Sequence, residues 1–207
     1  LYRRRPGQTK FEHLWAMTER SGATRSARHL QIGPSRVAWV GTELQIDINE
    51  WTAPLPQRLR GRITVRPQAM PCRAFALDAE ARHLWQPISP AARIAVAFDQ
   101  PRLNWHGEAY LDSNQGSRPL EADFKDWHWS RAALPGTCSQ VMYDVNDVNG
   151  KALSLALRFD AAGGVDTISA PPLCALPDTA WGLRRQTRCD LGRLPVELGR
   201  LESGPFY

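Results

Sequence analysis

The sequence lacks the segments that identify the common nucleotide cofactors, nucleophile elbows and membrane spans. Neither Gly-x-Gly-x-x-Gly nor Gly-x-x-x-x-Gly-Lys-Ser/Thr occurs in it, so it shows no cradle for a nucleotide cofactor. Gly-x-Ser-x-Gly is absent as well, which argues against a hydrolase built on a nucleophile elbow. No stretch reaches the roughly 18 to 20 apolar residues that a membrane-spanning helix needs. The basic N-terminus is followed by no apolar run, so it does not read as a signal peptide.

Cysteine is sparse, and positive charge is not concentrated anywhere. The four cysteines (Cys72, Cys138, Cys174 and Cys189) form no Cys-x-x-Cys pair and fit no zinc spacing, so we expect no metal and reduced thiols, as in a cytosolic protein. The formal net charge is +5, but the arginines are scattered rather than gathered in a stripe. This argues against a nucleic-acid partner. A solvated surface explains the charge most simply, and contact with an anionic membrane is the alternative.

Short alternating runs separated by proline and glycine dominate what is present. Sixteen prolines and fifteen glycines punctuate the chain. Strands are predicted at residues 37–40, 43–48, 61–66, 92–98, 139–145 and 153–159. Turns are predicted at residues 40–42 and 148–151, where glycine supplies a positive φ. Helical periodicity is almost absent, so the pattern predicts an all-β antiparallel sandwich or barrel with a weak boundary near residues 67–73.

Eight tryptophans make aromatic side chains the most unusual part of the composition. Trp85, Trp105, Trp127 and Trp129 lie close together in the sequence, with Tyr110 and Phe124 among them. A large aromatic core is the simpler interpretation. The functional alternative is a long apolar cavity whose walls stabilise a cation.

Two segments within this region combine aromatic and ionisable side chains. In a strand, Glu108, Tyr110 and Asp112 share one face, and His83 and Trp85 do the same in theirs. Asp112 also begins an Asp-x-Asn-x-Gly pattern that fits a strand end closed by an Asx turn. That pattern faintly resembles a calcium loop, but the further oxygen ligands are missing. By residues alone, the histidine is more often structural than catalytic.

The amino-acid sequences of several segments resemble those of the carotenoid 1,2-hydratases, also called hydroxyneurosporene synthases. The matching segments keep their order and read WAMTER (15–20), LPQRLRG (55–61), HLWQPI (83–88), YLDSNQG (110–116), PLE (119–121), WHWSR (127–131) and LESGPFY (201–207). The resemblance implies lipocalin-like antiparallel β halves that meet around an apolar cavity. Residues 1–70 would be part of an incomplete N-terminal half, and residues 71–207 would be the C-terminal half that carries the site.

The resemblance also implies a reaction, the addition of water to the C1–C2 double bond of an acyclic carotene of the lycopene or neurosporene type. The step needs a proton at C2 and leaves a tertiary cation at C1, which water captures. No redox step occurs, so no cofactor is expected. A weakly basic alkene requires an acid that stays protonated, and burial of a carboxyl favours that form.

The resemblance assigns the catalytic roles to four residues. Asp112 is the expected acid, Trp85 and Tyr110 are the aromatic walls, and His83 orients Asp112 or accepts a proton from the attacking water. Trp105, Trp127, Trp129 and Phe124 are expected to line the cavity. Glu121 and Asn114 are weaker candidates, for orienting a loop and closing a turn.

Substrate and location follow from the same resemblance. The partners are a carotenoid and water, and the enzyme is expected in the cytoplasm, peripheral to the inner or photosynthetic membrane. Two other functions fit the same fold. A carotenoid or lipid carrier would keep the aromatic lining without needing Asp112, and a related cyclase would shape its substrate in a rounder pocket.

Overall fold

The computed structural model describes residues 2–3, 12–13, 15–16, 22–53, 55–179 and 182–198. Regular structure in these residues is almost entirely antiparallel β-strand, with short helical turns such as η2 (Leu120–Ala122). The prediction of an all-β protein is therefore confirmed. A helix with the length and hydropathy of a membrane span does not occur in the described part of the chain. Two parts of the segments that carry the resemblance, residues 17–20 and 201–207, lie outside it.

The chain divides into two compact units, each made of two stretches. One unit combines residues 1–68 with 92–109, and the other combines residues 69–91 with 110–207. Two long strands, β10 (His83–Gln100) and β11 (Leu103–Gly116), each contribute residues to both units.

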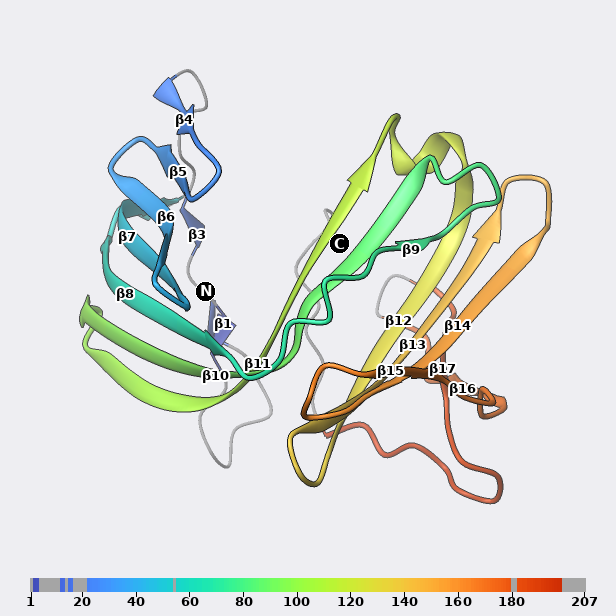
Figure 1. Ribbon diagram of the computed structural model, residues 1–207. Helices are drawn as coiled ribbons and strands as arrows, with labels where there is room; N and C mark the ends of the chain where they lie inside the picture. Colours follow the sequence, from blue (N-terminus) through green and yellow to red (C-terminus); the bar gives the residue numbers. More distant parts are fainter. Residues whose placement is uncertain are drawn as a thin grey trace. The chain divides into compact units, whose positions relative to one another are not determined.

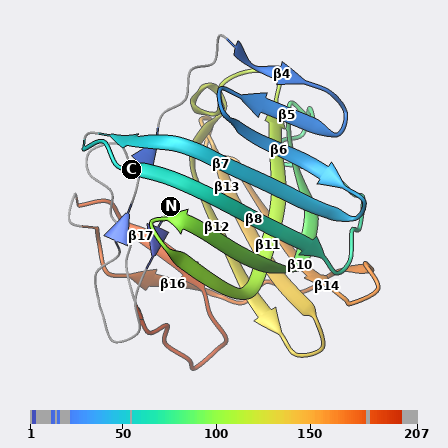
Figure 2. The same ribbon diagram turned by 90° about the vertical axis from the view of Figure 1, so that its left-hand side faces the viewer.

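The first unit is a broad antiparallel sheet (Figure 2). Its strands are β4 (Thr24–Arg25), β5 (His29–Ile32), β6 (Ser35–Val40), β7 (Glu43–Ala53) and β8 (Arg58–Pro67), followed by residues 92–100 of β10 and then β11. β3 (Trp15–Ala16) pairs with β7, and β1 (Tyr2–Arg3) pairs with β2 (Glu12–His13). The core gathers around Leu59, Val96 and Phe98. Gly61 lies opposite Phe98, and an added Cβ would come within 2.5 Å of the Phe98 Cα, so this register requires glycine.

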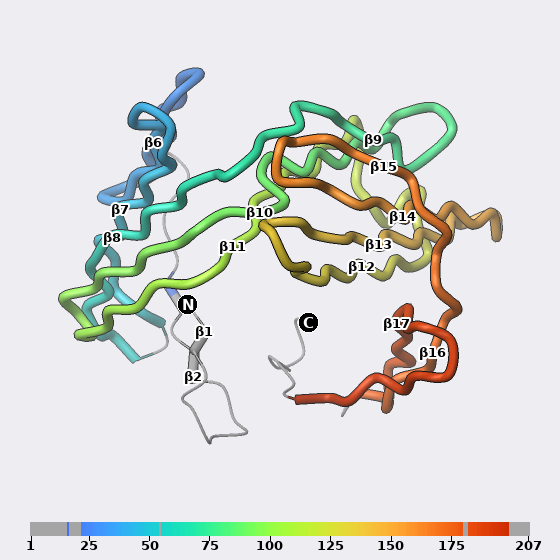
Figure 3. The backbone as a smooth tube through the Cα atoms, turned by 60° about the horizontal axis from the view of Figure 1, so that its bottom comes forward, coloured from blue at the N-terminus to red at the C-terminus, as the bar shows by residue number. Residues whose placement is uncertain are grey.

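The second unit packs two layers of strand around one apolar core. One layer contains β9 (Phe75–Ala76), the beginning of β10 and the end of β11. The other is the sheet of β12 (Phe124–Leu134), β13 (Cys138–Asp147), β14 (Ala152–Phe159) and β15 (Val165–Thr167), which run side by side in Figures 1 and 3. β16 (Leu173–Leu176) and β17 (Arg185–Arg188) form a separate hairpin. Phe75 and Trp85 from the first layer and Val141, Tyr143 and Phe159 from the second meet in the core.

The strands and turns predicted from alternation lie where they were expected. All six predicted strands fall within β6, β7, β8, β10, β13 and β14. Gly41 and Gly150 adopt φ values of 60° and 84° in the two predicted turns. All four cysteines are free thiols. Both main sheets stay open within the described residues, so a sandwich describes the second unit better than a barrel.

Candidate functional site

Alternation along two neighbouring strands brings the site together in the second unit. His83 and Trp85 both point to the buried side of β10, since every second residue from His83 to Ser89 is buried. Tyr110 and Asp112 lie on one face of β11, which is the neighbour of β10 in the sheet. Because β10 and β11 are neighbours, the β10 face that carries His83 and Trp85 lies next to the β11 face that carries Tyr110 and Asp112.

Asp112 receives two hydrogen bonds on a single carboxyl oxygen. The Trp85 indole N–H donates to Asp112 Oδ2 at 2.8 Å, and the Tyr110 hydroxyl donates to the same oxygen at 3.0 Å. Within the described residues, no hydrogen bond is made to Oδ1. Oδ1 is therefore the oxygen left open to a further partner, while both donors are directed at Oδ2.

The Tyr110 phenol is held in its protonated form. Burial, reinforced by the charge of Asp112 and the hydrogen bond to it, raises the pKa of Tyr110 well above its ordinary value of 10.0. Tyr110 thus remains a donor to Asp112 at every working pH.

Aromatic rings lie beside this carboxyl and contact one another in pairs. Trp85, which is completely buried, packs against Phe75 and meets Tyr143 edge to face, with 5.5 Å between the ring centroids. Tyr110 packs against Trp129 with a centroid separation of 5.1 Å. Trp129 and Tyr143 are directly opposite each other on β12 and β13. We call Trp85, Tyr110, Trp129 and Tyr143 the aromatic cage; their faces can stabilise a cation.

Arg131 fixes one side of the aromatic cage. Its guanidinium lies 5.6 Å from the centre of the Tyr110 ring, and its Nε–H donates to the carbonyl of Pro90 at 3.1 Å. The arginine therefore joins β12 to β10 and supports the ring that donates to Asp112.

His83 belongs to a different network from Asp112. Its Nε2 lies 2.7 Å from Asp123 Oδ2, and its ring packs on Phe124 at 4.7 Å. Asp123 also accepts hydrogen bonds from Arg118, which hold its pKa well below the ordinary range with further help from His83. No described hydrogen bond joins His83 to Asp112, and the hydrogen bonds that hold the Asp112 carboxyl come from Trp85 and Tyr110.

The glycine that ends the YLDSNQG segment makes room for this histidine. A Cβ added to Gly116 would lie 2.6 Å from His83 Nδ1. β11 continues as a strand to Gly116, so the alternative interpretation of residues 112–116 as an Asx turn was wrong. Asn114 is an exposed strand residue, and Glu121 is exposed in η2.

The four residues expected to line a cavity occupy different environments. Trp129 contacts Tyr110, and Trp127 lies two residues before it on β12, 47% exposed. Phe124 is buried in the core beside His83. Trp105 is exposed and belongs to the first unit.

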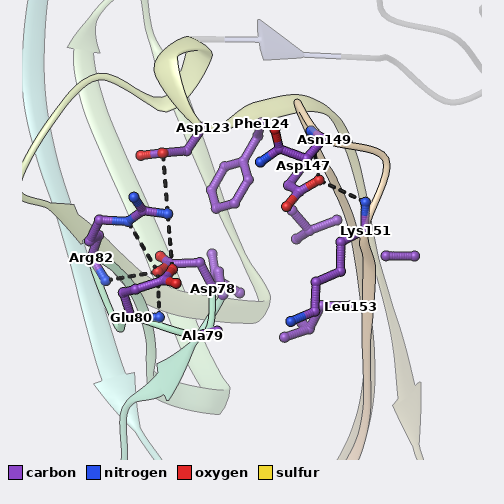
Figure 4. Close-up of a pocket in the computed structure, with 13 residues that line it drawn as sticks. Asp78, Ala79, Glu80, Arg82, Asp123, Phe124, Asp147, Asn149, Lys151 and Leu153 are labelled. Carbon is purple, nitrogen blue, oxygen red and sulfur yellow. Dashed lines mark hydrogen bonds and ion pairs between the residues drawn. The ribbon is translucent and has the colours of Figure 1, made fainter.

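Two cavities open elsewhere on the second unit. One, of about 350 Å³, is lined by charged and apolar side chains; Figure 4 shows Arg82 reaching toward Asp78 and Asp123 on one side, with Asp147 and Lys151 on the other. A second, of about 440 Å³, lies beside β16 and β17 and includes His128 and Asp126. Asp112 lines neither of them. The described residues contain no group of three or more His, Cys, Asp or Glu side chains placed to hold a metal ion.

Sequence reasoning missed Tyr143, Arg131 and Asp123. The alternation of Val141, Tyr143 and Val145 does mark a buried strand face, and Arg131 ends the WHWSR segment. Neither signal shows which strands become neighbours, and the partner of His83 lies 40 residues away in the sequence.

Comparison with known proteins gives consistent matches. The model of the carotenoid hydratase CrtC family matches residues 8–207. The acyclic carotenoid 1,2-hydratase of Thiocapsa roseopersicina is 47% identical over 196 residues, which are 93% of this chain and 48% of that protein. The protein of the same name from Rubrivivax gelatinosus is 40% identical over 196 residues, with the same coverage of 93% and 48%. That of Rhodobacter capsulatus is 37% identical over 204 residues, 96% of this chain and 72% of that protein. The chain thus spans about half the length of the first two relatives. No solved structure matches it.

Proposed function

The chain belongs to the carotenoid hydratase family, and we propose that it adds water to the terminal C1–C2 double bond of an acyclic carotenoid of the lycopene or neurosporene type. The relatives carry the name acyclic carotenoid 1,2-hydratase. The observation that carries the proposal for this chain is the half-buried Asp112 carboxyl, which has two donors on Oδ2, a free Oδ1 and aromatic rings around it.

The first step is proton transfer from Asp112 Oδ1 to C2 of the alkene. The π electrons form the new C–H bond, and a tertiary cation remains at C1. Negative charge develops on the Asp112 carboxylate at the same moment. The donors from Trp85 and Tyr110 are already aimed at Oδ2, so this charge is stabilised without reorganisation.

The second step is capture of the cation by water. A water oxygen bonds to C1, and the resulting oxonium returns one proton to the Asp112 carboxylate. The alkene and water have then combined into a tertiary alcohol, and the acid is regenerated. Since no electrons are exchanged with another molecule, the scheme uses no cofactor. The neutral rings of the aromatic cage stabilise the cation between the two steps.

His83 takes the role of a positioning residue in this scheme. Its bond to Asp123 fixes the start of β10, two residues before Trp85. Trp129 and Trp127 are the tryptophans we assign to the polyene, because Trp129 contacts the site and Trp127 continues the same strand face toward solvent. The positions of Phe124 and Trp105 give no such support.

We also propose that the protein works in the cytoplasm at the membrane surface, where a long hydrocarbon substrate is dissolved. The net charge of +5 and the exposed Trp127 support this. Co-flotation of the protein with anionic vesicles at low salt tests this membrane binding. Equal recovery of the protein with neutral and with anionic vesicles would contradict a contribution of the positive charge.

The test of the proposed reaction compares the full chain with its Asp112→Asn variant. Lycopene in detergent or liposomes is the substrate, and chromatography measures the hydroxylated product. We expect product from the wild type and a loss of at least about 100-fold in the variant, as for removal of a general acid. Asp126→Asn is the matched control, since Asp126 bonds Asn146 on the neighbouring strand and has no described contact with the site.

Either of two results would count against the assignment. Near-normal activity of Asp112→Asn would show that the proton comes from elsewhere. Tight binding of lycopene by the wild type without any conversion would favour a carrier.

A further inference from the structure

Hydration requires a bound water as well as an acid, and the described part of the second unit contains a buried tyrosine whose ring belongs to the aromatic cage but whose hydroxyl the scheme above does not use. This is Tyr143, in the middle of β13 and only 7% exposed. Its hydroxyl makes no hydrogen bond within the described residues, where Ser139 Oγ is the only fully enclosed side-chain oxygen or nitrogen without a partner, so solvent reaches the Tyr143 oxygen. A hydroxyl that solvent reaches and that no protein group occupies can hold an ordered water. The oxygen of Tyr143 is therefore free to bind a small polar molecule.

Two separate contacts place Tyr143 at the same site as Asp112. Its ring meets the Trp85 ring edge to face at 5.5 Å, and that indole donates directly to Asp112. On the other side, Tyr143 faces Trp129 across the β12–β13 pair, and Trp129 packs on Tyr110, the second donor to Asp112. Tyr143 thus completes the aromatic cage.

The electrostatic surroundings agree with this placement. Burial raises the pKa of the Tyr143 hydroxyl, and the charge of Asp112 raises it further. The phenol stays neutral, so it is a poor nucleophile toward the cation. A neutral phenol oxygen can still accept a hydrogen bond from water.

We propose that the Tyr143 hydroxyl binds the water molecule that attacks C1, which makes Tyr143 a further catalytic residue of the hydration. By accepting one O–H of that water, the phenol turns a water lone pair toward the cation. After the C–O bond forms, the oxonium proton passes to the Asp112 carboxylate. This inference rests on the proposed function and adds to it the residue that selects capture by water over loss of a proton.

Without a positioned water, the cation has one simple alternative. It returns a proton from C2, or from a methyl carbon next to C1, to the Asp112 carboxylate and becomes an alkene again. In D2O the carboxyl delivers deuterium to C2. Loss of the remaining C2 proton then leaves deuterium in the recovered carotene, loss of a methyl proton gives a deuterated isomer with the double bond moved, and return of the same deuterium leaves no label. Exchange therefore measures protonation alone, and alcohol formation measures protonation followed by water capture.

The experiment is hydration of lycopene in D2O by the full chain, by Tyr143→Phe and by Tyr110→Phe. Mass spectrometry measures both the alcohol and the deuterium content of the recovered carotene. Tyr143→Phe keeps the ring that contacts Trp85 and loses no described hydrogen bond, so it should fold like the wild type. We expect its alcohol yield to fall roughly 10- to 100-fold while deuterium exchange continues. Tyr110→Phe, which removes a donor to the acid, should lower alcohol and exchange together.

The outcomes separate this inference from the proposed function. Unchanged hydration by Tyr143→Phe would overturn the inference, and so would a parallel fall of exchange and hydration, which would mean that Tyr143 serves the acid. If the wild type gives neither alcohol nor exchange, the proposed function itself fails, and the inference fails with it.

Discussion

Replacing Trp85 by phenylalanine isolates one of the two donors on which the acid depends. Trp85 is completely buried, and its indole N–H donates to Asp112 Oδ2 at 2.8 Å. Phenylalanine keeps a ring in the core but has no donor. Tyr110 alone would then stabilise the charge that develops on Oδ2.

Stability and activity should both fall, by different amounts. The smaller ring leaves a void of roughly 40 Å³, which costs about 1 kcal/mol of folding free energy. Loss of a hydrogen bond to a carboxyl adds about 1 to 2 kcal/mol. For a chain of this size, a total of about 2 to 3 kcal/mol lowers Tm by roughly 5 to 10 °C. Removal of one donor aimed at developing charge should lower kcat/KM about 100-fold.

The assay combines thermal unfolding with lycopene hydration well below the new Tm. Trp105→Phe is the matched control, because Trp105 is exposed, belongs to the first unit and makes no described hydrogen bond to Asp112. Activity of Trp85→Phe within about threefold of the wild type, despite the expected loss of Tm, would refute the role of this donor in stabilising the carboxylate. A rate loss of that size corresponds to well under 1 kcal/mol.

Two further predictions concern the framework of the second unit. Gly116→Ala places a Cβ 2.6 Å from His83 Nδ1, so it should lower both Tm and hydration activity, whereas Gly22→Ala, with open space around it, should change neither; equal behaviour of the two variants would contradict the close approach. Burial raises the pKa of Asp144, but bonds from Arg188 and Ser154 outweigh this and hold it below its ordinary value of 3.8. Since the folded pKa is the lower one, this stabilisation is present above about pH 4 and is lost as the pH falls further. Urea unfolding between about pH 2 and pH 6 should therefore show that the free energy of unfolding of Asp144→Asn falls less steeply with decreasing pH than that of the wild type. The same pH dependence in both proteins would contradict this role of Asp144.

Alternation predicted most of the fold because it reports directly on buried faces. It located β6, β7, β8, β13 and β14, and it placed Tyr110 with Asp112 and His83 with Trp85 on shared faces. It did not show the full extent of β10, since the prolines at 87 and 90 within that strand read as breaks.

Pairing between strands was beyond the reach of the same reasoning. The partner of His83 was expected to be Asp112, but the structure supplies Asp123 from the start of β12. The sequence around each aspartate does not show which of the two the histidine meets. Tyr143 and Arg131 were missed for the same reason: their importance comes from what faces them across the core and not from their own neighbours in the sequence.

The shared hairpin of β10 and β11 limits how this protein can be divided. Residues 92–100 pair with β8 in the first unit, whereas residues 83–91 of the same strand carry Trp85 in the second. A fragment that ends near residue 70 would leave β8 with an unpaired edge, and a fragment that starts there would carry residues 92–100 of β10 without their neighbour β8. Both pieces would tend to aggregate, so experiments that exchange or isolate one unit should move the whole of residues 83–116 with β8.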